Sequence, residues 1–199
     1  ATDLSSLRMV VTGSSVVPID LIEGFHQRGI PVGQVYGSTE TCPIAAVLRR
    51  EDAFRKIGST GKPALHCEVR VVDDQGAEAP DHVPGELWGR GPNVMREYWG
   101  NTEATAAVFR DGWYRSGDVG YRDEDGFLFI HDRKRDIIIS GSENIYPAEV
   151  ENALNEHPAV VESAVVGQED AQWGEVPVAF IITRTPEALM AAPSSACNA

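Results

Sequence analysis

The sequence predicts an α/β protein, α+β overall, in which the end of a large domain is followed by a hinge and a small, incomplete α+β C-terminal domain. Three observations support this. A strand, helix and strand pattern opens the chain, short β-rich runs broken by Gly and Pro fill its middle, and a second helix with two apolar runs follows residue 134. With 199 residues, 42% of them hydrophobic, the chain is long enough to bury a core.

Residues 1–57 are predicted to form the end of an α/β sheet. Leu7–Thr12 is a short apolar run closed by glycine, Pro18 suits the first turn of a helix that ends at Gly29, and Val32–Tyr36 resumes as a strand. Ligands of such sheets bind beyond the carboxyl ends of the strands. The two loops that follow the strands, "GSSVVP" and "YGSTE", are therefore expected to lie near each other.

Residues 58–133 are predicted to form a β-rich, barrel-like subdomain. Short runs such as Glu68–Val72 and Glu86–Trp88 alternate with Gly and Pro, and one small helix follows Thr102. The segment "GSTGKPA" looks like a phosphate-binding loop, but it lacks the required spacing and runs into a strand pattern instead of a helix. Lys62 is therefore not expected to bind phosphate.

Residues 134–199 are predicted to be a partial small domain, with a hinge near 133–136. Phe127–Ile130 and Ile137–Ser140 are expected to pair as a hairpin around the basic turn between them. The remaining elements are a helix from Pro147 and two apolar runs, Val160–Val166 and Val178–Thr183.

The amino-acid composition narrows the classes of function that are expected for this chain. Thirty acidic residues against 17 basic ones give a net charge of −13, which argues against nucleic-acid binding. The three cysteines are far apart and odd in number, which suits a reducing compartment, and no run is long enough to span a membrane. The sequence carries no secretory signal pattern, so a cytoplasmic location is expected. A homodimer is one assembly that the sequence leaves open.

A few polar side chains could serve a phosphorylated ligand. Asp118 follows Ser116 and Gly117 in a predicted turn, and its carboxylate offers two acceptors to the paired hydroxyls of a ribose. Tyr36, Thr39 and Glu40 end a strand, where they could stack on a base, meet a phosphate and hold Mg²⁺. The basic run Arg133–Arg135 could bind phosphate. Each has a simpler interpretation as a turn or surface residue, and the run as a solvated hairpin tip.

Four segments in order carry a family resemblance: "GQVYGSTET", "GELWGRGPNVMREYWGN", "DGWYRSGDVGYRDEDGFLFIHDRKRDIIISG" and "ENIYPAEVE". Together they resemble the adenylate-forming superfamily, most closely its acyl-CoA synthetases, including fatty-acid CoA ligases. The resemblance implies ATP, Mg²⁺ and coenzyme A as cofactors and a carboxylic acid, expected to be a fatty acid, as substrate. The acid would attack the α-phosphate of ATP to give an acyl-adenylate, and the CoA thiol would then displace AMP.

The resemblance also implies roles for individual residues. Tyr36 corresponds to the aromatic residue that stacks on adenine, Thr39 to a hydroxyl at the phosphates and Glu40 to the Mg²⁺ ligand. Asp118 matches the ribose-binding carboxylate, and Arg133 the arginine near the ribose and phosphates.

Five further residues receive roles in the same way. Gly13, Ser14 and Ser15 resemble the loop beside the adenine. Arg135 falls at the hinge about which the small domain rotates between the two half-reactions. Gly141 lies in a segment that resembles the lining of the pantetheine tunnel, where glycine allows close backbone approach.

Two parts of the family pattern are absent from this sequence. One is a loop with a lysine that holds the β- and γ-phosphates, and the other is a lysine near the C-terminus that bridges the acid and the phosphate. The only lysines are Lys56, Lys62 and Lys134. The sequence therefore predicts a fragment that alone does not form an adenylate. Three alternatives stay open: an adenylation domain of a peptide synthetase, an aryl-acid or luciferase-like ligase, and a non-catalytic nucleotide-binding remnant.

Overall fold

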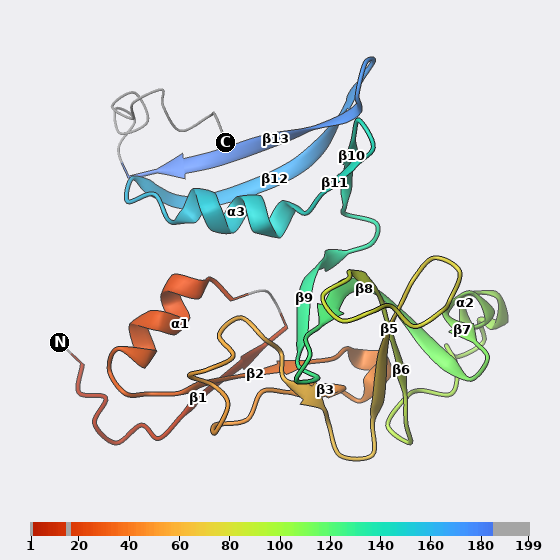
Figure 1. The fold of residues 1–199 in the computed structure, drawn as a ribbon, viewed down its shortest axis with the longest axis horizontal. Helices are drawn as coiled ribbons and strands as arrows, with labels where there is room; N and C mark the ends of the chain where they lie inside the picture. The colour runs from red at the N-terminus through yellow and green to blue at the C-terminus, as the bar shows by residue number, and fades with distance from the viewer. Residues whose placement is uncertain (1, 15–16, 185–199) are drawn as a thin grey trace. The chain divides into compact units, whose positions relative to one another are not determined.

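The computed structural model describes residues 2–14 and 17–184, and the chain divides into two compact units, one ending at Arg135 and the other beginning at Asp136 (Figure 1). The predicted α/β fold class is confirmed, with strands more abundant than helices. No helix in the described ranges is long and apolar enough to cross a membrane.

The first unit begins with a four-stranded sheet in the order β1-β2-β3-β4. Its strands and its helices are β1 (Val10–Gly13), β2 (Val32–Tyr36), β3 (Ala46–Val47), β4 (Lys62–Pro63), α1 (Ile19–His26) and the short 3₁₀ helix η1 (Thr39–Thr41). The strands β1 and β2 are parallel and α1 connects them, as the sequence predicts. Pro18 occupies the N-cap position of α1, and Ile22 is the buried residue of this helix, at 1% exposure.

A second, antiparallel sheet completes the first unit. Its elements are β5 (Glu68–Val72), β6 (Gly85–Arg90), β7 (Phe109–Arg110), β8 (Trp113–Arg122), β9 (Leu128–Arg133) and the helix α2 (Thr102–Val108). The order is β5-β6-β8-β7, with β9 on the other part of β8. The core joins both sheets, because Ala46 of β3 packs with Val71, Leu87 and Leu128, and Tyr36 packs against this cluster.

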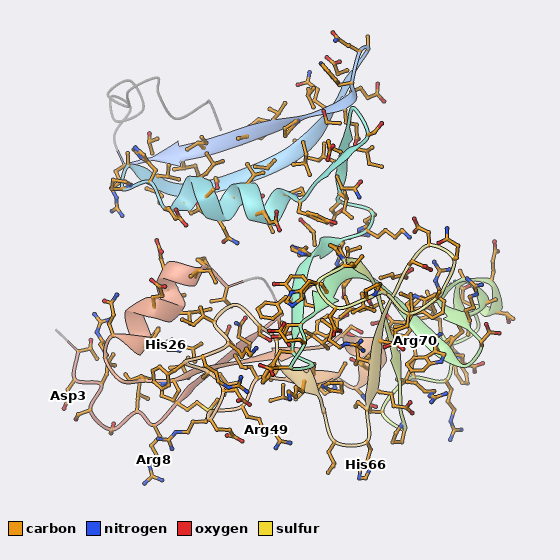
Figure 2. The ribbon with its side chains drawn as sticks, in the orientation of Figure 1. Asp3, Arg8, His26, Arg49, His66 and Arg70 are labelled. Atoms are coloured by element: carbon orange, nitrogen blue, oxygen red, sulfur yellow. The ribbon has the colours of Figure 1, made fainter. Side chains whose placement is uncertain are left out.

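One face of this sheet carries a cluster of guanidinium and indole groups. Arg70 projects from β5 among the side chains of the sheet (Figure 2), with its guanidinium carbon 5.0 Å from the ring centre of Trp88 and 4.1 Å from that of Trp113. Trp88 is only 2% exposed. These cation–π contacts stabilise the sheet that carries the candidate site described below.

The second unit is a four-stranded antiparallel sheet covered by one helix. Its elements are β10 (Ile138–Ser140), β11 (Glu143–Ile145), α3 (Pro147–Asn155), β12 (Val160–Asp170) and β13 (Gly174–Thr183), and the strand order is β11-β10-β13-β12. Figure 1 shows α3 running along the β12–β13 hairpin. Pro147 occupies the first turn of α3, as predicted, and both predicted apolar runs are strands.

The predicted hairpin between Phe127–Ile130 and Ile137–Ser140 is wrong. The strand β9 pairs with β8 instead, across the tight turn that ends at Gly126, and β10 pairs with β11. Each strand thus takes its neighbour across a glycine turn, at Gly126 with φ +82° and at Gly141 with φ +55°. Such turns close at little steric cost, and the basic run offers no comparable turn residue.

Candidate functional site

The carboxyl ends of β1 and β2 lie side by side. Gly13 pairs with Val35, so Ser14 and Tyr36 follow at the same edge of the sheet. A Cβ on Gly13 would lie 2.6 Å from Val35 Cγ2 and 2.9 Å from its carbonyl oxygen, so only glycine fits there. Ser14 has a φ of +74°. Ser15 lies outside the described residues, so the structure places two of the three residues of the predicted loop.

Tyr36 and Asp118, separated by 82 positions, are in direct contact. The Tyr36 hydroxyl donates a hydrogen bond of 2.7 Å to Asp118 Oδ2. The backbone N–H of Asp118 donates to Ser116 Oγ at 3.0 Å, and that hydroxyl donates to the Leu87 carbonyl at 2.7 Å. Three strands therefore fix the position of this carboxylate.

The prediction that Asp118 lies in a turn is wrong, because it lies within the ten-residue strand β8. Gly117, with a φ of +74°, interrupts the regular strand conformation, and its carbonyl accepts from Lys134 N–H at 2.7 Å. A Ser-Gly pair is typical of a turn, but here neighbouring strands on both sides satisfy the backbone. The result is an irregular strand that aims Asp118 at Tyr36.

Burial dominates the ionisation of this pair. It raises the pKa of the Asp118 carboxyl, although the hydrogen bond from Tyr36 and the charge of Arg133 act in the opposite direction. Burial and the nearby Asp118 charge raise the pKa of Tyr36 well above its ordinary value. Tyr36 therefore remains a protonated donor, and Asp118 pays a cost in free energy when it ionises.

Arg133 stands across from Asp118, since the two residues are register partners on β9 and β8. Its Nε lies 3.7 Å from Asp118 Oδ1, and its side chain is 62% exposed. The positive charge also acts on Glu40, whose pKa it lowers. A guanidinium with this exposure keeps donors available for a phosphate.

Glu40 lies in η1, directly after β2. Gly37 precedes this helix at a point where a Cβ would lie 1.8 Å from the Pro43 carbonyl, so the chain turns sharply. Ser38 and Thr41 close the turn, with the Ser38 N–H donating to Thr41 Oγ1 at 2.8 Å. Thr39 is exposed at the start of the helix. Thr39 and Glu40, which are predicted to act at the phosphates and at Mg²⁺, thus lie just after β2, the strand that ends at Tyr36.

Tyr98 holds the Glu40 carboxylate. Its hydroxyl donates to Glu40 Oε1 at 2.8 Å. Burial raises the pKa of Glu40, but hydrogen bonds, including the one from Tyr98, and the charge of Arg133 bring it below its ordinary value. Burial and the charge of Glu40 raise the pKa of Tyr98 to about 12. Glu40 is therefore an ionised carboxylate, and Tyr98 is a neutral phenol.

The donor set suits Mg²⁺ that is shared with a nucleotide. Among the described residues, no group of three or more His, Cys, Asp or Glu side chains could hold a metal ion by itself. Mg²⁺ characteristically binds through one or two carboxylates together with substrate phosphates and water. Glu40 could supply that single carboxylate.

Sequence reasoning did not identify three residues at this site: Tyr98, Tyr114 and Ser116. Tyr114 is 5% exposed, and burial raises its pKa, with Ser38, Glu40, Asp118 and Arg133 all close enough to act on it. All three residues lie inside the quoted motifs. A buried tyrosine hydroxyl needs a hydrogen-bond partner, so the tyrosines within these motifs are the sequence signal that could have identified the two phenol groups.

A cavity with a volume of about 430 Å³ lies elsewhere in the first unit. It is lined by Val47, Arg49, Glu51, Asp52, Lys62, Pro63, Ala64, Leu65 and Phe127. None of these belongs to the cluster around Asp118. Lys62 Nζ lies 4.5 Å from the centre of the Phe127 ring. That Lys62 does not bind phosphate stays a prediction. The convergence of chemistry, not the size of a cavity, identifies the candidate site.

In the second unit, Gly141 lies at the β10–β11 turn. Its N–H donates to the Trp173 carbonyl at 2.8 Å, and a Cβ there would lie 2.6 Å from a carbon of the Trp173 ring. Packing against Trp173 thus requires glycine at this position. The contact of Gly141 with pantetheine stays a prediction, as does the hinge role of Arg135, which is the last residue of the first unit.

Gly141→Ala is expected to destabilise the second unit by about 2 kcal/mol more than Gly174→Ala. Both glycines have positive φ, +55° and +83°, but a Cβ at Gly174 would meet only the Ile139 carbonyl, at 3.6 Å. Because the left-handed minimum lies near +57°, backbone strain alone would make Gly174→Ala the costlier variant, so a larger loss at Gly141 reports the clash with the indole ring. Amide exchange of β10 and β13 over a urea series measures it, and equal losses in the two variants would show that Trp173 moves aside freely.

Two family models match the chain. The model of the AMP-binding enzyme matches residues 1–99, and that of the AMP-binding enzyme C-terminal domain matches residues 149–195. An indoleacetate–CoA ligase from Aromatoleum aromaticum is 54% identical over 182 residues, which make up 92% of this chain and 36% of the ligase.

Solved structures agree with the family models. The o-succinylbenzoate CoA synthetase from Bacillus subtilis, in complex with its acyl-adenylate intermediate, matches with a TM-score of 0.85 and 45% identity, over 90% of this chain and 37% of that one. The same synthetase in complex with ATP and a magnesium ion gives 0.83 and 44%, over 90% and 37%. The chain thus spans a little over a third of the length of the proteins that it matches.

Proposed function

Because the chain belongs to the AMP-binding enzyme family, we propose that it is part of an ATP-dependent acid–CoA ligase and that it carries that enzyme's adenylate site. The observation that supports this most is the cluster of Tyr36, Asp118, Arg133 and Glu40, gathered from four separate elements of the first unit. It combines an aromatic ring, a buried carboxylate, an exposed guanidinium and a carboxylate for a cation.

Each group has a part in the proposed reaction. Asp118 accepts the ribose hydroxyls, and the ring of Tyr36 lies against the base while its hydroxyl orients Asp118. Gly13 ends the adjoining strand opposite Val35, and Ser14 follows it. They suit the predicted loop beside the adenine.

The remaining groups act on the phosphates. Arg133 and the hydroxyl of Thr39 bind phosphate oxygens as charge develops on them. Mg²⁺ bound at Glu40 would neutralise phosphate charge, so that an anionic carboxylate can approach. The acid oxygen bonds to the α-phosphorus and pyrophosphate leaves; in the second step, the CoA sulfur bonds to the acyl carbon and AMP leaves.

We propose an aromatic acid as the substrate. The relatives described above are named for indoleacetate and for o-succinylbenzoate, both aromatic carboxylic acids, and they do not support the fatty-acid expectation. Among the alternatives, these names favour an aryl-acid ligase that uses CoA over a peptide-synthetase domain that loads a carrier protein.

Thioester formation by the whole protein tests this proposal. With ATP, Mg²⁺ and CoA, indoleacetate and o-succinylbenzoate are expected to yield thioester with a kcat/KM at least about tenfold higher than that of a long-chain fatty acid. The 199-residue chain, assayed in parallel, is expected to form none, because it holds no lysine after Lys134. A preference for the fatty acid would contradict the proposed acid class, and turnover by the chain alone would contradict its role as a part.

A further inference from the structure

The loop between β6 and α2 lies against the turn that carries Glu40, and its contacts reach both the backbone and the side chain of that residue. Met95 N–H donates to the Glu40 carbonyl at 2.7 Å, and the Tyr98 hydroxyl donates to Glu40 Oε1 at 2.8 Å. The Asn93 side-chain amide donates to the Thr41 carbonyl at 2.6 Å and to the Ile44 carbonyl at 3.2 Å. Three residues of one loop thus hold one short turn.

This loop is itself held by the antiparallel sheet and by α2. Asn93 Oδ1 accepts from Cys67 Sγ at 3.2 Å, and a Cβ on Gly91 would lie 2.6 Å from Asn93 Oδ1 and 2.8 Å from the His66 carbonyl. At its other end, Tyr98 N–H donates to Thr105 Oγ1 at 3.0 Å. The loop therefore fixes the η1 turn, which follows β2 of the first sheet, relative to the antiparallel sheet.

The turn has few internal means of fixing Glu40. The helix η1 has only three residues, and its own hydrogen bonds join Ser38 to Thr41 and Thr39 to Cys42, on either side of Glu40. A glutamate side chain also loses considerable rotamer entropy when it is ordered. Within the turn, the Glu40 N–H and the Ser38 side chain act on the carboxylate as hydrogen-bond donors that lower its pKa. Tyr98 adds a donor from outside the turn, at Oε1.

We propose that Tyr98 and Asn93 are positioning residues for nucleotide-bound Mg²⁺: Asn93 holds the turn and Tyr98 holds the Glu40 carboxylate. The inference rests on the proposed function, because Glu40 matters here as a ligand of the cation. Both residues order the turn and the Glu40 carboxylate before the ligand binds. Binding then costs less conformational entropy, and the affinity for the metal–nucleotide complex is higher.

A titration with and without Mg²⁺ tests the role of Tyr98. ATP is titrated into the chain by calorimetry, once with Mg²⁺ and once with EDTA, and the ratio of the two dissociation constants gives the gain due to Mg²⁺. Tyr98→Phe is expected to lower this gain about tenfold. In a Glu40→Gln background, which lacks the carboxylate, Tyr98→Phe is expected to change the gain no further. Tyr121→Phe, on β8 and stacked on Phe129, is the matched control.

The outcomes separate the two hypotheses. Failure of the wild-type chain to bind ATP under either condition would overturn the proposed function, and this inference with it. ATP binding with the same Mg²⁺ gain in wild type and Tyr98→Phe would overturn the inference alone. An equal effect of Tyr98→Phe in the Glu40→Gln background would also overturn it, because Tyr98 would then act by another route.

Amide exchange tests the role of Asn93 without any ligand. Asn93→Ala is expected to speed exchange in the segment 38–44 at least about tenfold, while β8 keeps its rate. Asn101→Ala is the control, since Asn101 Oδ1 accepts from Ala104 N–H at 3.0 Å and its loss should affect only α2. Unchanged exchange of 38–44 in Asn93→Ala would show that the turn orders itself, which the proposal excludes.

Discussion

Asp118→Asn is expected to stabilise the folded chain at neutral pH and to weaken AMP binding at least about tenfold. Burial raises the folded-state pKa of Asp118, so its contribution to stability is present below the unfolded pKa and is lost as the pH rises through the folded one. An amide carries no charge and escapes this loss. It still accepts from Tyr36, but it offers one acceptor oxygen where the ribose hydroxyls need two.

Thermal unfolding across pH and AMP calorimetry measure both effects. The gap in Tm between the variant and wild type should widen as the pH rises from the unfolded to the folded pKa of Asp118, and it should stay constant above the folded pKa. Asp111→Asn is the control: this side chain is 84% exposed, and the residue already has a φ of +49°, which asparagine tolerates. A variant that loses both stability and AMP binding would show that Asp118 is a structural residue instead of a ligand site.

Asp123→Ala is expected to lower the free energy of unfolding of the first unit by about 3 kcal/mol. Asp123 is 4% exposed in the turn between β8 and β9. Its Oδ1 accepts from Phe127 N–H at 2.7 Å, and its Oδ2 lies 2.6 Å from Lys56 Nζ. The substitution leaves a buried N–H without its acceptor and removes the closer of two carboxylates from Lys56, which keeps Asp125 at 2.8 Å.

Urea unfolding at about pH 7 and about pH 3 tests this expectation. Burial raises the pKa of Asp123, but the contacts with Lys56 and Phe127 outweigh it and the net pKa is below the ordinary 3.8. The stabilisation is therefore present above pH 3.8 and is lost as the pH falls through the folded pKa, so the difference between wild type and variant should shrink in acid. Asp125→Ala, 50% exposed, is the control and should cost less. Equal losses from both would contradict the assigned roles.

Local pattern was enough to predict most of the fold. The strand Val32–Tyr36 occurs within its predicted bounds, Pro18 and Pro147 mark the starts of helices, and the family resemblance is confirmed. These features depend on residues that are close together in the chain, so the sequence pattern alone predicts them. The hairpin predicted around the basic run does not form because β9 and β10 each pair across a glycine turn, which the backbone closes at lower steric cost.

The candidate site could be predicted only in part, because its contacts join distant segments. Asp118 and Glu40 stand out as carboxylates in motifs, but nothing local shows that their partners are Tyr36 and Tyr98, 82 and 58 positions away. Asn93 carries no charge and has no obvious chemistry. Its importance appears only when its amide is found on the carbonyl of Thr41.

The central claim is that the first unit holds a nucleotide through its ribose, and calorimetry of the wild-type chain with AMP and with 2′,3′-dideoxy-AMP tests it most directly. AMP is expected to bind, and the dideoxy analogue to bind at least about tenfold more weakly, because it has no hydroxyls for Asp118. Absence of AMP binding, or equal affinity for the two nucleotides, would contradict the claim.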